Sequence, residues 1–180
     1  MKSLLILILL LGGIMTFCSC EQSDSVWPSN RQTSFMHPTA QIDFVIKQLE
    51  EKKEPYQSAY QQMIRKADNA LEESHHAVED FSVPGYYQDP QGHSKGALGL
   101  QKDGFNAYAC ALAYRLDAGD QYGIKACEYI NAWAKINKKY SDYDGELAMT
   151  DAGAGIVIAA QLMYGSDLWK KKIINYSTSG

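Results

Sequence analysis

The residues best suited to proton transfer and ligand binding lie in one irregular stretch, Phe81 to Lys102. This stretch shows no helical or strand period. It contains two adjacent tyrosines, Tyr86 and Tyr87, and then His93. Histidine can transfer a proton near neutral pH, and tyrosine offers an apolar ring with a hydroxyl that forms hydrogen bonds. Long loops are usually functional or disordered, and this aromatic content argues against disorder. We therefore predict a functional loop, with the alternative that the tyrosines only pin it to neighbouring helices.

A second candidate is the adjacent pair His75 and His76, whose residue type is common in metal sites. Neighbouring residues on a helix point about 100° apart, so the two imidazoles cannot easily share one ion. No nearby cysteine or carboxylate completes a ligand set of familiar spacing. The sequence therefore predicts neither a metal site nor a cofactor.

A helical hairpin that would position these residues is predicted between Asp103 and Trp133. Asp103 has the type of an N-cap, Ala118 and Gly119 end the first helix, and Asp120 caps the second. Apolar residues recur at spacings of three and four in both helices, which makes one stripe on each. The first stripe is Phe105, Tyr108, Ala109, Leu112, Ala113 and Leu116; the second is Tyr122, Ala126, Tyr129, Ile130 and Trp133. So short a connection predicts antiparallel neighbours.

Three further helices are predicted from the same periodicity. The first covers about 41–52, and the second begins at Pro55 and continues to about Ser74. A polar turn at 140–145 precedes an Ala- and Gly-rich stretch, with a last helix from about Asp151. The predicted fold class is all-α, built from antiparallel helical hairpins.

The N-terminus has the pattern of an export signal. Lys2 precedes an apolar run from Leu4 to Ile14, too short for a comfortable membrane span. Ser19 before Cys20 resembles a lipoprotein cleavage site, which we favour over an ordinary cleaved signal. We expect residues 1–20 to be a lipoprotein signal, 21–40 a flexible tether and 41–180 the domain. The product would be a periplasmic or cell-surface protein that contacts a membrane only through a lipid on Cys20.

Composition and cysteine content bear on the possible binding partners and on disulfide formation. The formal net charge of −4 and the lack of a basic patch argue against nucleic-acid binding. An acidic excess does not exclude a polyanionic substrate, because the local field of a cleft matters more than the total charge. Outside the signal, only Cys110 and Cys127 remain. They flank the hairpin turn at similar distances, and we favour two free thiols over a disulfide.

The hairpin also carries a family resemblance. Its stretch ALAYRLDAGDQYGIKACEYINAWA, Ala111 to Ala134, resembles the alginate lyase superfamily, and a weaker likeness covers about 35–169. The resemblance implies part of an α/α toroid and a polysaccharide lyase that cleaves a uronate-containing glycan by β-elimination. The partner would be an acidic polysaccharide. Because loops at one end of such toroids line the substrate groove, the implied substrate-binding residues are Tyr86, Tyr87, His93 and Asn106.

The chain departs from the family pattern in its catalytic residues. The family's asparagine, histidine, arginine and tyrosine lie mostly beyond the position matched by Trp169, so none is carried over. We therefore expect the N-terminal part of a lyase, truncated before its main catalytic residues and inactive alone. One alternative is a surface-tethered carbohydrate-binding helical domain without catalysis. Another is an exported helical-repeat protein whose partners the sequence does not identify.

Overall fold

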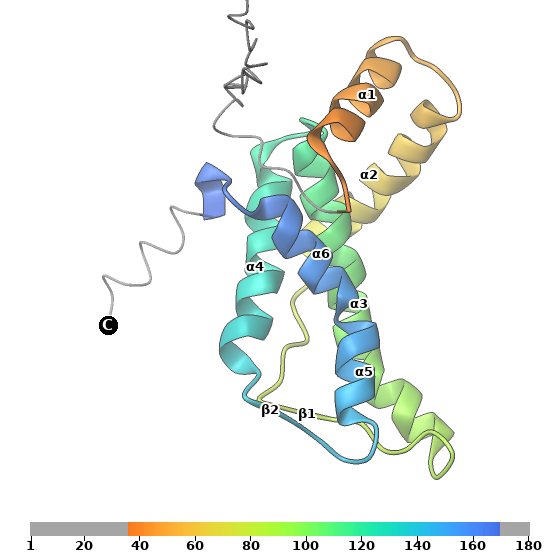
Figure 1. Cartoon of the computed structure of the whole chain (residues 1–180), viewed down its shortest axis with the longest axis vertical. Helices are drawn as coiled ribbons and strands as arrows, with labels where there is room; N and C mark the ends of the chain where they lie inside the picture. Colours follow the sequence, from red (N-terminus) through yellow and green to blue (C-terminus); the bar gives the residue numbers. More distant parts are fainter. Residues whose placement is uncertain (1–35, 170–180) are drawn as a thin grey trace, which may run out of the picture.

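The computed structural model describes residues 36–169. The predicted signal, Cys20 and most of the predicted tether lie outside this range, as do residues 170–180. The elements, shown in Figure 1, are α1 (Thr39–Glu50), α2 (Tyr56–Glu72), β1 (Asp80–Ser82), α3 (Pro90–Arg115), α4 (Asp120–Ile136), β2 (Lys139–Ser141), α5 (Gly145–Ala152) and α6 (Ala154–Met163). The described chain is mostly helical, as predicted, and does not itself form a closed ring.

The longest helix, α3, lies at the centre and contacts α2, α4, α5 and α6. It runs antiparallel to α4, which confirms the predicted hairpin (Figure 1). Gly119 has a φ of 138°, a conformation that a side chain disfavours, and it allows the sharp turn between the helices. Asp120 is the first residue of α4 and makes no capping hydrogen bond, so its predicted capping role is wrong. Its charge still favours the helix N-terminus.

The start of α3 differs from the prediction. The helix begins at Pro90, and Asp89 caps it by accepting a hydrogen bond from Gly92 N at 2.9 Å. Asp103, the predicted N-cap, therefore lies inside the helix. Glycines made the first half of α3 look like a loop, but they allow close packing. A Cβ on Gly96 would lie 3.0 Å from the backbone oxygen of Ser82. Packing of the segment before α3 outweighs the poor helix propensity.

A two-stranded parallel sheet corrects the all-α prediction. β1 pairs with β2, with Asp80 opposite Lys139 and Phe81 opposite Tyr140. The ammonium of Lys139 lies 3.0 Å from Asp80 Oδ2. The strands have three residues each, too few for an alternating pattern to be recognised, and the whole of α3 and α4 lies between them in the sequence. They join the segment before α3 to the one after α4.

The last predicted helix, from about Asp151, corresponds to α6; α5 is a further helix that the sequence did not predict, and the two meet at Gly153. Helix α6 crosses α3 closely at Gly155. A Cβ on this glycine would lie 2.5 Å from the backbone carbon of Gly104 on α3. Within residues 36–169 no single helix has the length and apolar composition to cross a membrane. Taken together, α5 and α6 meet those two criteria with a 42° bend between them.

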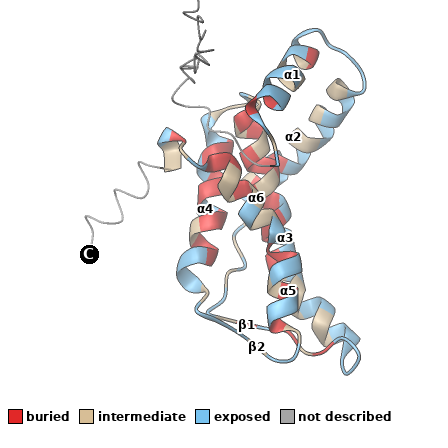
Figure 2. Cartoon of the chain, viewed as in Figure 1, coloured by how far each residue is buried: buried red, intermediate tan, exposed pale blue. Residues whose placement is uncertain are grey.

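Buried residues concentrate where α3, α4 and α6 meet (Figure 2). Every residue of the stripe predicted for α4 is buried. The stripe predicted for α3 is only partly right, since Phe105 is 57% exposed while Asp103 and Asn106 are buried. Helix α3 is surrounded on several sides, so a single stripe does not describe it. A second cluster joins β1 to the hairpin: Phe81, Val83, Leu100, Trp133, Ala148 and Ala152.

Candidate functional site

Three of the four predicted substrate-binding residues lie together. The rings of Tyr86 and Tyr87 meet edge to face with centroids 5.7 Å apart, and Tyr86 meets His93 in the same way at 5.5 Å. We call these three residues the aromatic cluster. Tyr87 is 98% exposed and Tyr86 is 52% exposed, so their rings are open to a ligand.

The aromatic cluster is held by two elements. His93 lies in the first turn of α3, and the tyrosines lie in the turn before it, where Gly85 O accepts from the backbone nitrogens of Gln88 and Asp89. Asp144, just before α5, accepts from Tyr86 N at 2.7 Å and lies 3.4 Å from His93 Nε2. The stretch is therefore ordered, as its aromatic content predicted. It presents apolar ring edges beside hydroxyl and imidazole groups.

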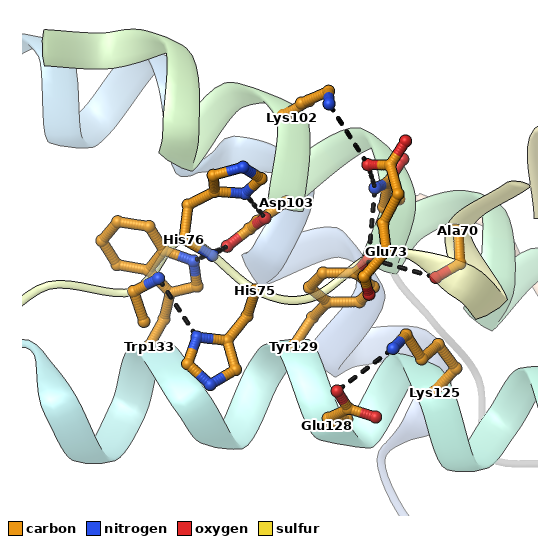
Figure 3. Close-up of polar contacts among 12 residues, drawn as sticks. Ala70, Glu73, His75, His76, Lys102, Asp103, Lys125, Glu128, Tyr129 and Trp133 are labelled. Atoms are coloured by element: carbon orange, nitrogen blue, oxygen red, sulfur yellow. Dashed lines mark hydrogen bonds and ion pairs between the residues drawn. The ribbon is translucent and has the colours of Figure 1, made fainter.

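The fourth predicted residue, Asn106, does not face this turn. It is 1% exposed, and its amide nitrogen donates to Glu73 Oε2 at 2.9 Å and to Tyr129 Oη at 3.2 Å. Tyr129 Oη lies within hydrogen-bond distance of two backbone oxygens of α2 and its end (Figure 3). The bond from Asn106, helped by nearby Lys102, holds the pKa of Glu73 below its usual value. Asn106 therefore ties α3 to α2 and α4, and this packing does not favour its predicted sugar contact.

A polar group that the sequence did not predict lies one turn before Asn106. Asp103 is fully buried, and its Oδ1 accepts from His76 Nδ1 at 2.7 Å. Its Oδ2 accepts from the backbone nitrogen of His76 and from Trp133 Nε1, both at 2.7 Å (Figure 3). Three N–H donors thus satisfy one buried carboxyl group. They fix the His76 ring, whose side chain remains 44% exposed.

His76 borders a pocket of about 380 Å3 between the segment before β1 and helix α3. Its walls are largely apolar. Among the described residues that line it, the only ionisable ones are basic: His76, Lys95 and Lys102. Gly99 also lines the pocket, and a Cβ there would lie 2.9 Å from the Cβ of His76. The glycine therefore permits the close approach that brings His76 to its place.

The two adjacent histidines have separate surroundings. His75 Nδ1 accepts from the backbone nitrogen of Ala77 at 3.3 Å, whereas His76 bonds to Asp103. Across residues 36–169, no group of three or more histidine, cysteine or acidic side chains is arranged to hold a metal ion.

Comparisons of the chain with protein-family models, curated proteins and solved structures found no match. The site must therefore be interpreted from its own geometry. That geometry offers an exposed aromatic cluster and a separate pocket with basic side chains. The first was predicted. The pocket was not predicted because His76 and Asp103, which form its fixed histidine, are far apart in the sequence. The one sequence feature that could have pointed to it was Asp103, an aspartate next to an Ala-rich helical stretch.

Proposed function

We propose that this chain is the N-terminal part of an exported, lipid-anchored polysaccharide lyase of the alginate lyase type. Its substrate would be a uronate-containing polysaccharide, cleaved by β-elimination. The chain alone would bind the polymer without cleaving it. The observation that carries this proposal is the aromatic cluster, in which Tyr86, Tyr87 and His93 come together on an ordered, exposed turn. Exposed aromatic rings with polar tips suit the alternating apolar and hydroxyl surface of a sugar.

The helices give this proposal further support. The stretch with the family resemblance coincides with the α3–α4 hairpin, the repeating unit of an α/α toroid. Helices α5 and α6 expose apolar side chains, with Leu147 67% and Val157 59% accessible. In a toroid of successive hairpins such faces are covered by the next hairpin. We propose that further hairpins complete such a toroid.

The chemistry explains why the chain alone is expected to be inactive. β-Elimination removes the proton on C5 of a uronate and expels the oxygen on C4, leaving a C4–C5 double bond. The neighbouring carboxylate must be neutralised so that the developing charge is stabilised. A base then takes the C5 proton and an acid protonates the leaving oxygen. The aromatic cluster offers tyrosine and histidine, whereas the family's main catalytic residues are not carried over onto this chain.

Binding of the chain to immobilised alginate, compared with neutral dextran, tests the proposal. Tyr87→Ala removes an exposed ring that supports no core packing, and we expect at least a fivefold loss of alginate affinity with unchanged folding. Tyr164→Ala removes another exposed tyrosine, on a different part of the surface, and should leave affinity unchanged. Equal retention on alginate and dextran, or equal effects of the two substitutions, would contradict the proposal.

The same cluster also suits the second candidate, a tethered carbohydrate-binding domain without catalysis. The two differ in what the gene encodes after the codon for Gly180. If an uninterrupted frame continues with helical hairpins, the longer product should convert alginate to unsaturated sugars that absorb ultraviolet light. If binding occurs and no such frame exists, the binding domain becomes the better description.

A further inference from the structure

The pocket beside His76 has the composition of an anion site. Two lysines and a histidine border it, and none of its described lining residues is acidic. Lys102 lies 3.4 Å from Glu73, which offsets part of its charge, whereas Lys95 has no ion pair among the described residues. The walls between these groups are apolar: Val78, Phe81, Leu98, Leu100 and Trp133. A ligand that fits must combine a negative group with an apolar surface.

His76 is already held in one orientation. Asp103 bonds to both its ring and its backbone nitrogen, and Gly99 leaves room for its Cβ. Because Nδ1 is occupied, Nε2 is the nitrogen left for a ligand, and it has no hydrogen-bond partner within residues 36–169. A side chain whose orientation is already fixed loses little entropy on binding. Asp103 itself is fully buried, with both oxygens engaged, so it does not enter the pocket.

We propose that this pocket is a subsite for one uronate unit. The sugar carboxylate accepts hydrogen bonds from Nε2 of His76 and from the ammonium groups of Lys95 and Lys102. The face of the sugar ring that presents C–H groups lies on the apolar wall around Trp133. That the ligand is a uronate sugar rests on the proposed function; that it carries a negative group beside an apolar surface follows from the lining of the pocket.

Histidine side-chain NMR spectra of the whole chain provide the test. The chain has four histidines, so His76 can be assigned by comparison with a His76→Asn variant. We expect sodium glucuronate to shift the His76 signal in a saturable way and neutral glucose to leave it in place. Sodium acetate and sodium phosphate probe the charge without the ring, and we expect them to bind at least tenfold more weakly. A glucose shift as large as that of glucuronate, or equal affinity for phosphate, overturns the uronate assignment.

Matched variants test the named contacts. His76→Asn keeps a donor for Asp103 at the position of Nδ1 but removes Nε2, so the fold should persist while glucuronate binding is lost. Lys95→Gln and Lys102→Gln should each weaken binding about fivefold. Lys47→Gln makes the same charge change on the exposed side of α1 and should have no effect. Unchanged binding in a folded His76→Asn variant would overturn the proposal.

The outcomes also separate this inference from the proposed function. If alginate binding depends on Tyr87 while glucuronate does not shift the His76 signal, the subsite is wrong and the proposed function stands. If glucuronate shifts the His76 signal but the chain does not bind alginate, the carboxylate subsite stands and the polysaccharide function is wrong.

Discussion

Asp103 on α3 accepts a hydrogen bond from the indole nitrogen of Trp133 on α4 at 2.7 Å, inside the core. The same oxygen accepts from the backbone nitrogen of His76, in the segment that leads to β1. One buried carboxyl group therefore joins both arms of the central hairpin to the segment that crosses them. This arrangement links the stability of the hairpin to the orientation of His76.

We expect Asp103→Asn to destabilise the protein. Asparagine offers one acceptor oxygen where three N–H donors now point, and its own amide hydrogens face those donors. A buried donor left unsatisfied costs about 1–3 kcal/mol, so the free energy of unfolding should fall by at least that amount. Urea denaturation followed by circular dichroism measures it. Asp151→Asn, at an exposed position of α5, is the matched control and should change stability little.

The crossing of α3 and α6 should not tolerate a methyl group. In Gly155→Ala the new Cβ would lie 2.5 Å from the backbone carbon and oxygen of Gly104, and backbone cannot move aside cheaply. We expect a loss of about 1–3 kcal/mol, the usual cost of overpacking. Gly145→Ala is the control, because its nearest neighbours are 3.4 Å away. Similar melting temperatures for the two variants would show that the helices separate easily.

Cys110 and Cys127 are fully buried thiols that are not joined by a disulfide, as the sequence predicted. Burial raises the pKa of the Cys110 thiol to about 12, so almost no reactive thiolate exists at neutral pH. We expect iodoacetamide to leave Cys110 unmodified in the folded protein and to modify it fully in urea. Mass spectrometry of the Cys110 and Cys127 peptides reads this out. Rapid alkylation without denaturant would show that this part of the core opens.

Stability should fall in alkaline solution. The hydrogen bond from Tyr122 to Asp68, at 2.6 Å, is the main reason that the pKa of Tyr122 rises from 10.0 to about 12. The folded state therefore holds this proton more tightly than the unfolded state. Its stabilising effect is complete below pH 10 and is lost as the pH rises through about 12.

A Tyr122→Phe variant isolates this effect. It removes both the hydrogen bond and the titrating group, so it should be less stable at neutral pH by about 1 kcal/mol. Between pH 9 and pH 12 its stability should fall less than that of the unsubstituted protein, although Tyr129, also with a pKa of about 12, still titrates. Urea midpoints measured across this range test the claim. Parallel pH curves for the two proteins would contradict it.

The candidate site was predictable where it depended on residue type within one short stretch. Two adjacent tyrosines and a histidine in one irregular stretch predict a functional loop, and the structure brings Tyr86, Tyr87 and His93 together. Asn106 was assigned to the same surface, yet its amide lies in the core between Glu73 and Tyr129. Because α3 starts earlier than predicted, Asn106 lies well inside a central helix, and its contacts there do not favour the predicted sugar contact.

Local sequence patterns are enough to predict the α3–α4 hairpin, apart from the first half of α3. Its buried stripe on α4 and the turn at Gly119 follow from local spacing and from the backbone freedom of glycine. The pairing of β1 with β2 and the bonds from Asp103 to His76 and Trp133 are visible only in the folded chain, whereas Asp89 and Pro90 are local signals for the start of α3. The reason is physical. Helix periodicity acts over three or four residues, whereas the strand pairing and the hydrogen bonds of Asp103 join segments at least 27 residues apart, and no local pattern encodes them.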